Sequence, residues 1–138
     1  YQYEDEIKTN EQDPTYQKLN QLLQVVKSQN ELNSEVYTLT YDEKNEEFFF
    51  GVSSSEKPFY RHVYDHFPEE LVEHYQDGGK IGVYEDMNGH WLSAFAPIRT
   101  SKGVVVGVVQ ADSLFDEFIS EARDAILINI GFCHFYKF

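Results

Sequence analysis

The sequence predicts a single α+β domain with a five-stranded antiparallel sheet covered by helices. One amphipathic helical segment comes first, and five short segments rich in β-branched and aromatic residues follow it. A stretch without strand character separates the second of these five segments from the third. A length of 138 residues suits one domain, and 41% hydrophobic residues are enough apolar mass for a core. Elements in this order most simply make one sheet with helices packed on it.

The N-terminal helix is expected to begin at Asp13-Pro14, after a polar and acidic segment over residues 1–13. Proline is tolerated at the first helical position because its missing N–H would be unpaired there in any case. Apolar residues spaced by three and four predict one apolar helical face, made of Tyr16, Leu19, Leu23 and Val26. Polar residues 30–34 end the pattern, so the helix is expected to be long.

Residues 36–41 and 47–52 are expected to form a hairpin around an acidic turn. Strand character then disappears over residues 53–80. Within that stretch Pro68 precedes two glutamates, which favours a short helix because acidic side chains stabilise a helix N-terminus. Gly78 and its glycine neighbour would end that helix, so we expect a helical crossover between the hairpin and the remaining strands.

Three more strands are predicted at 81–86, 90–99 and 104–111. Asn88-Gly89, a strong hairpin signal, joins the first two, and a turn at 101–103 joins the last two. These three segments are therefore expected to form a meander.

The C-terminal helix is expected to begin at Ser113, because a serine followed three residues later by Asp116 matches a capping box. Residues 125–133 are apolar on nearly all sides, as in a helix buried in protein or lipid, yet the run is shorter than the roughly 20 residues that a membrane span needs. The segment 127–138 is interpreted as the start of a membrane span, an appended tail or a dimer-packing segment. The apolar face of the helix is predicted from Leu114, Phe115, Phe118, Ile119, Ala122 and Ile126.

Two segments of the meander resemble a known family. GVYED at 82–86 with NGHWLSAFAPI at 88–98, and GVVVGVVQAD at 103–112, are similar to Cache sensor domains, whose sheet is PAS-like. The resemblance covers residues 14–126, which we take as the domain. It implies a periplasmic or extracellular module of a transmembrane signal-transduction receptor, such as a histidine kinase, a chemoreceptor or a cyclase.

The same resemblance implies how such a domain works. The N-terminal helix would come from one membrane span and the C-terminal helix would lead into the next, so the whole protein would be membrane-tethered and is expected to dimerise through these helices. A small ligand would bind between the sheet and the crossover.

Composition limits the other function classes. With 11 Lys and Arg against 24 Asp and Glu, the formal charge of −13 argues against nucleic acid and anionic lipid surfaces as partners. Cys133, the one cysteine, cannot form an internal disulfide and leaves the redox compartment open. Ser53, Ser54 and Ser55 lie in no nucleophile motif, and no phosphate-binding glycine loop is visible, so neither an enzyme nor a cofactor is expected in the domain itself.

Arg61 stands among aromatic residues at the start of the crossover. Its guanidinium offers a planar fork of donors to a carboxylate, and Tyr60 and Tyr64 supply apolar walls with hydroxyl tips. Some Cache receptors for amino acids carry an Arg followed by Trp and Tyr, and a strand-end Asp that takes the ligand amine; here Tyr64 and Asp112 match, whereas Val63 replaces the Trp. The expected ligand is a small carboxylate or amino acid.

The sheet should supply the other wall of the site. Gln110 and Asp112 share one parity, as do Ser93 and Phe95, and Tyr84 lies on the neighbouring strand. Which parity faces the crossover stays open, because a slip of one residue inverts every side chain. The predicted ligand-binding residues are Tyr60, Arg61, Tyr64, Tyr84, Ser93, Phe95, Gln110 and Asp112.

Purely structural interpretations of these residues stay open. Arg61 could be solvated or paired with an acid, and Asp112 could cap the C-terminal helix. His62 and His66, with Asp65 and His74 nearby, have a spacing that could hold a metal on one helical face, but surface or packing histidines are the preferred reading, so no metal is expected.

Two other functions compete with ligand sensing. The first is a dimerisation or protein-interaction module without a small ligand, which would use Leu19, Leu23 and Val26 between protomers. The second is a cytoplasmic PAS domain with a bound cofactor.

Overall fold

A computed structural model describes residues 11–57, 60–86 and 89–135 and confirms the predicted α+β class. The five strands form one antiparallel sheet in the order β2-β1-β5-β4-β3, which is compatible with a PAS-like fold. The elements are α2 (Pro14–Gln29), β1 (Val36–Asp42), β2 (Glu47–Ser53), α3 (Glu69–Glu73), β3 (Gly79–Asp86), β4 (Gly89–Arg99), β5 (Val105–Leu114) and α4 (Phe115–Phe135).

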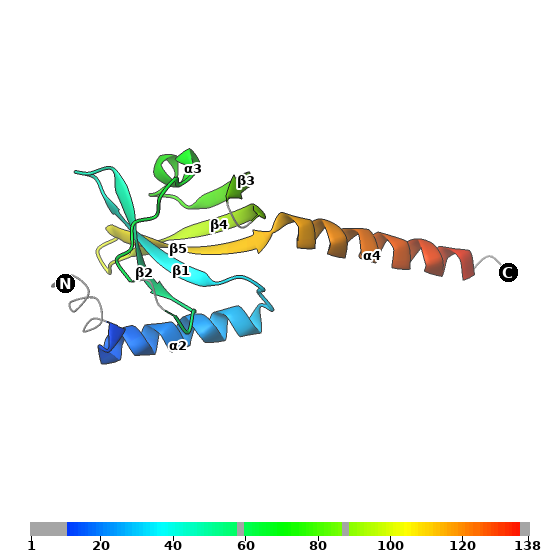
Figure 1. The fold of residues 1–138 in the computed structure, drawn as a ribbon, viewed down its shortest axis with the longest axis horizontal. Helices are drawn as coiled ribbons and strands as arrows, with labels where there is room; N and C mark the ends of the chain where they lie inside the picture. Colours follow the sequence, from blue (N-terminus) through cyan, green and yellow to red (C-terminus); the bar gives the residue numbers. More distant parts are fainter. Residues whose placement is uncertain (1–10, 58–59, 87–88, 136–138) are drawn as a thin grey trace.

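Helices lie on both sides of the sheet (Figure 1). α2 runs along one face, and α3 lies on the opposite face within the crossover that carries the chain from β2 at one edge to β3 at the other. α4 continues from β5 and projects away from the sheet, so the start of α2 and the end of α4 lie at opposite ends of the molecule (Figure 1).

The start of α2 is capped as the sequence predicts. The Asp13 side chain accepts hydrogen bonds from the backbone N–H groups of Thr15, at 2.7 Å, and Tyr16, at 3.3 Å. These bonds, that of Thr15 first, hold the pKa of Asp13 below its ordinary value. Pro14 occupies the first helical turn, where no intrahelical donor is needed.

The predicted apolar face of α2 is only partly buried. Tyr16 is 7% exposed and Leu23 is half-buried, but Leu19 and Val26 are 43% and 36% exposed. Helical spacing shows which residues share a face but not how closely the sheet approaches that face.

The core lies on the α3 side of the sheet, because alternate residues of each strand point that way. α3 covers these residues with Leu71, which is fully buried. The buried core consists of Tyr37, Leu39, Phe48, Leu71, Ile81, Phe95 and Val108.

The helix start predicted at Ser113 is wrong. Ser113 pairs with Leu92, and Leu114 pairs with Trp91, so β5 continues to Leu114 and α4 begins at Phe115. Because Ser113 is paired with β4, it belongs to the strand, and the helix starts two residues later.

α4 is continuous through residue 127, where the domain was expected to end. Two of its apolar side chains, Ile126 and Leu127, are 60% and 58% exposed. Among the described residues, no helix is both long enough and apolar enough to cross a membrane. The remainder of the predicted tail, residues 136–138, lies outside the described residues, as does most of the segment 1–13.

Candidate functional site

A cavity of about 460 Å³ lies between the sheet and the crossover, where β5 passes into α4. Five of its ten lining residues are aromatic and two are acidic, whereas none of these described residues is Lys or Arg. The lining consists of Asn33, Ser34, Glu35, Tyr37, Phe50, Tyr64, Tyr84, Trp91, Asp112 and Leu114.

The strand register shows which side chains of the sheet face this cavity. Residues directly opposite each other on neighbouring strands face the same side of a sheet. Ser93 lies opposite Asp112, and Trp91 lies opposite both Leu114 and Tyr84. These residues therefore all face the crossover, which settles the parity that the sequence left open.

The crossover reaches the cavity because residues 61–64 run along the outer edge of β2. Arg61 N–H donates to the carbonyl of Phe50 at 2.6 Å, and Tyr64 N–H donates to the carbonyl of Phe48 at 2.7 Å. Arg61 has a φ of 62°, a left-handed conformation that turns the chain onto this edge. Tyr64 consequently packs on Phe50, with ring centroids 5.3 Å apart, and both rings line the cavity.

Asp112 accepts three side-chain hydrogen bonds. Tyr37 OH donates to Oδ2 at 2.8 Å, while Ser93 Oγ and Gln110 Nε2 donate to Oδ1 at 2.7 and 3.0 Å. Gln110 Nε2 also donates to Tyr37 OH at 2.7 Å. Tyr84 OH lies 2.9 Å from Ser93 Oγ and must be the donor, because the single hydroxyl hydrogen of Ser93 is used on Asp112.

The tyrosines of this network keep their protons. Burial first, and the Asp112 charge second, raise the pKa of Tyr37 far above its ordinary value. Burial is also the main cause that raises the pKa values of Tyr84 and Tyr64. The hydroxyl groups therefore remain donors at neutral pH, and the network holds the Asp112 carboxylate in one orientation.

The predicted site residues divide into three groups. Tyr64, Tyr84 and Asp112 line the cavity. Ser93 and Gln110 do not line it, but they are buried and hydrogen-bond the carboxylate of Asp112. Whether any of them binds a ligand stays a prediction.

The remaining three predicted residues lie elsewhere. Phe95 is 5% exposed and packs in the core. Tyr60 packs edge-on against Tyr16 of α2, with ring centroids 5.6 Å apart. Arg61 is exposed and, with Tyr60, borders a different hollow at β1 and β2, so the predicted pairing of Arg61 with Asp112 across one site is wrong. The edge pairing of residues 61–64 decides this, and no periodicity in the sequence reveals it.

Sequence reasoning missed seven of the ten residues that line the cavity. Trp91 and Leu114 share the parity of Ser93 and Asp112, so the period-2 pattern could have found them. Tyr37 and the loop residues Asn33 and Ser34 approach only through tertiary packing, for which the sequence carries no local signal.

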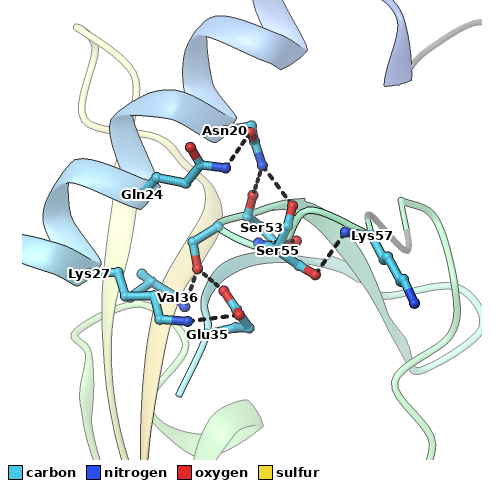
Figure 2. Close-up of polar contacts among 9 residues, drawn as sticks. Asn20, Gln24, Lys27, Glu35, Val36, Ser53, Ser55 and Lys57 are labelled. Carbon is cyan, nitrogen blue, oxygen red and sulfur yellow. Dashed lines mark hydrogen bonds and ion pairs between the residues drawn. The ribbon is translucent and has the colours of Figure 1, made fainter. Parts of the chain in front are cut away.

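A second hollow, of about 690 Å³, lies between α2 and the chain after β2, and polar contacts join these two segments beside it (Figure 2). Asn20 Nδ2 donates to the main-chain oxygens of Ser53, at 2.6 Å, and Ser55, at 3.0 Å. Lys27 Nζ lies 2.8 Å from Glu35 Oε1. Because Glu35 also lines the cavity at Asp112, the attachment of α2 adjoins that cavity.

The histidines are not arranged as the helical spacing would require. The backbone from His62 to His66 is extended and turned rather than helical. Within the described parts of the chain, no group of three or more His, Cys, Asp or Glu side chains is placed to hold a metal ion.

Comparison with known proteins adds no assignment. No protein-family model matches the chain, and no curated protein matches it.

Proposed function

We propose that this chain is a Cache-type ligand-sensing domain of a transmembrane receptor, with its small-molecule site in the cavity at Asp112. Support comes from the sheet order, which is compatible with a PAS-like fold, and from the resemblance of segments that form β3, β4 and β5. The domain binds and transmits, and any catalytic step belongs to an output domain.

The observation that carries this proposal is the position of the cavity between the two helix junctions. Asn33, Ser34 and Glu35 join α2 to β1, whereas Asp112 and Leu114 end the strand that continues into α4. Asn33 Nδ2 also donates to Glu117 Oε2 of α4 at 3.0 Å. A ligand here would touch both junctions, so it would favour one arrangement of the helices over another if the two arrangements bind it unequally.

The projection of α4 makes it the output element in this proposal. Among the described residues, α4 contacts β4 and β5, and Asn33 bonds Glu117 near its start, while the helix projects away from the sheet (Figure 1). A small rotation at Leu114 would therefore move the far end of a 21-residue helix. α2 begins at the opposite end of the molecule, so tethering to a membrane through α4 agrees with this geometry most directly.

A chemically mixed ligand panel tests the proposal. Organic acids, amino acids, amines and sugars are screened by thermal shift on wild type and on Ser34→Phe, which places a ring at the cavity wall. Ser101→Phe, on the exposed β4–β5 turn, is the matched control. We expect at least one compound to stabilise wild type and the control but not Ser34→Phe. If no compound does so, the cavity is not a ligand site.

Exposed apolar side chains on two helices support a dimerisation module as a second candidate. Leu19 and Leu22 on α2 are 43% and 56% exposed, and Phe118 and Ile119 on α4 are 50% and 48% exposed. Sedimentation equilibrium of wild type and of Leu19→Gln/Leu22→Gln would separate the candidates. A dimer lost in the variant, together with a failed ligand panel, would favour dimerisation as the function.

A further inference from the structure

The chemistry of the cavity wall identifies a ligand class that the sequence did not suggest. We infer that the cavity at Asp112 takes an alkylated ammonium cation, a tertiary or quaternary amine, and not the carboxylate expected from Arg61. This inference rests on the proposed function, because it specifies the ligand of the same site.

An anionic ligand finds no basic side chain in the described lining of this cavity. The described lining holds the carboxylates of Asp112 and Glu35 and no basic side chain. The hydroxyl hydrogens of Tyr37 and Ser93 are used on Asp112, and that of Tyr84 is used on Ser93. A bound carboxylate would therefore meet the carboxylates of Asp112 and Glu35, and it could take a hydrogen bond from Tyr37, Ser93 or Tyr84 only by breaking this network.

A cation meets a fixed negative charge instead. Glu35 is paired with Lys27, so Asp112 is the lining carboxylate whose neighbours are hydrogen-bond donors without a formal charge. Its charge is held in place by Tyr37, Ser93 and Gln110 but is not neutralised by them. Such a charge in a partly enclosed site favours a positively charged guest.

The hydrogen-bond capacity of Asp112 narrows the class further. A carboxylate has about four acceptor positions, and three are occupied by Tyr37, Ser93 and Gln110. The remaining acceptor position is on Oδ2, so Asp112 can accept at most one further hydrogen bond from an N–H group of the ligand. A primary ammonium carries three donors, of which Asp112 can take one, whereas the alkyl groups of a tertiary or quaternary amine need no further acceptor and can pack on the aromatic rings.

The aromatic walls supply the rest of the recognition. The rings of Phe50, Tyr64 and Trp91, together with those of Tyr37 and Tyr84, line the same cavity as Asp112. Aromatic faces attract alkylated ammonium groups through their quadrupole, and several rings around a cation form a cage for it. A cavity of about 460 Å³ also lies within the usual range for small-molecule sites.

Probes of one shape and different charge test the inference. Choline is the cation, 3,3-dimethylbutan-1-ol its neutral isostere, glycine betaine a zwitterion, 3,3-dimethylbutanoate the matched anion, and ethanolamine the primary ammonium. Trp91 is the single tryptophan of the chain and lines the cavity, so its fluorescence reports binding directly. We expect choline to bind at least about tenfold more tightly than its neutral isostere and than ethanolamine, and the anion not to bind.

Two kinds of variant connect this preference to the cavity. Asp112→Asn keeps the shape of the side chain and should reduce the preference for choline over the isostere to about threefold or less. Tyr64→Leu removes a ring and should weaken choline binding about tenfold. Tyr64→Phe keeps the ring and should change the affinity for choline by less than about threefold. The Tyr64 pair keeps the test valid if Asp112→Asn fails to fold.

Equal binding of choline and its isostere, tighter binding of the anion or of ethanolamine, or no choline binding would each overturn the inference. These failures differ from failure of the proposed function. If the anion or the isostere binds and Ser34→Phe abolishes that binding, the cavity is a sensor site for another ligand class.

Discussion

The two faces of the sheet are held together by different interactions. On the α3 face, Leu39, Phe48, Leu71 and Val108 are fully buried in a continuous apolar core. On the α2 face the helix buries Tyr16 but leaves much of Leu22 exposed, and specific polar contacts hold it. Burial of apolar area is the main source of folding stability, so the α3 face should anchor the fold while α2 is the more easily displaced layer.

This difference bears on the proposed signalling function, because the cavity at Asp112 lies beside both layers. Its sheet wall belongs to the stable face, whereas Glu35 belongs to the polar attachment of α2. Such a site has one wall on the stable sheet and another wall, at Glu35, on the layer that is more easily displaced. Elements that shift in response to ligands are drawn from the less stable parts of a protein.

The largest expected effect is on the core of the α3 face. Phe48 contacts the rings of Tyr41, Phe67 and Tyr75 at centroid distances of 4.6, 4.9 and 5.9 Å. Phe48→Ala should lower the free energy of unfolding by about 3–5 kcal/mol, because it leaves a cavity in packed aromatic surroundings. Urea unfolding followed by Trp91 fluorescence measures this loss.

Leu22→Ala on the exposed side of α2 is the control for that prediction. Leu22 is 56% exposed, so its truncation should change the free energy of unfolding by about 0.5 kcal/mol or less. Comparable losses in the two variants would mean that α2 contributes as much to stability as the core does, contrary to the comparison of the two faces.

A smaller effect is expected where α2 is fastened to β2. Asn20→Ala removes the two hydrogen bonds from Asn20 Nδ2 to Ser53 and Ser55 and should cost about 1 kcal/mol. Native-state hydrogen exchange should show faster exchange of α2 amides with little change in β5.

Gln24→Ala serves as its matched control, because the side chain of Gln24 bonds Asn20 on the exposed surface and does not reach the sheet. If Asn20→Ala accelerated exchange in β5 as much as in α2, the helix and the sheet would be one cooperative unit, and the idea of a displaceable layer would be lost.

The smallest effect expected is a pH dependence at the attachment of α2. Partial burial alone would raise the pKa of Glu35, but hydrogen bonds from Lys27 and Ser54, with the Lys27 charge, lower its pKa below the ordinary value of 4.5. A lowered pKa in the folded state means that this contribution to stability is present above pH 4.5 and is lost as the pH falls through the lowered value.

Glu35→Gln should therefore remove part of the loss in Tm between pH 7 and about pH 3.5, because the amide does not titrate there. Glu56→Gln is the control, since Glu56 lines the same hollow, whereas the ammonium group of Lys27 contacts Glu35. Equal acid sensitivity of wild type and Glu35→Gln would show that the Lys27–Glu35 pair adds nothing measurable.

Sequence reasoning located the strands well because their signals are local. The period-2 pattern and the turn residues placed all five strands within three residues of their observed ends, and Asp13-Pro14 marked the start of α2. The error at Ser113 arose because a capping box is a local motif, whereas β4 extends the pairing of β5 past it.

The site was harder to predict because it depends on register and on the path of an irregular segment. Shared parity put Gln110 with Asp112 and Ser93 with Phe95, but the pattern did not say which face they occupy, and it did not bring Tyr37 to Asp112. Arg61 was placed wrongly because residues 61–64 follow the edge of β2 through backbone hydrogen bonds, which any sequence could make.

The sequence by itself determined the class of fold, the order of its elements and the acidic, aromatic chemistry from which any site must be made. These properties follow from local periodicity and composition, which each segment carries without its neighbours. Only the tertiary structure decided that Asp112 lies among five aromatic rings while Arg61 lies outside the cavity. Packing between distant segments sets which side chains meet, and for that reason we propose a cation as the ligand, whereas the sequence alone suggested a carboxylate or an amino acid.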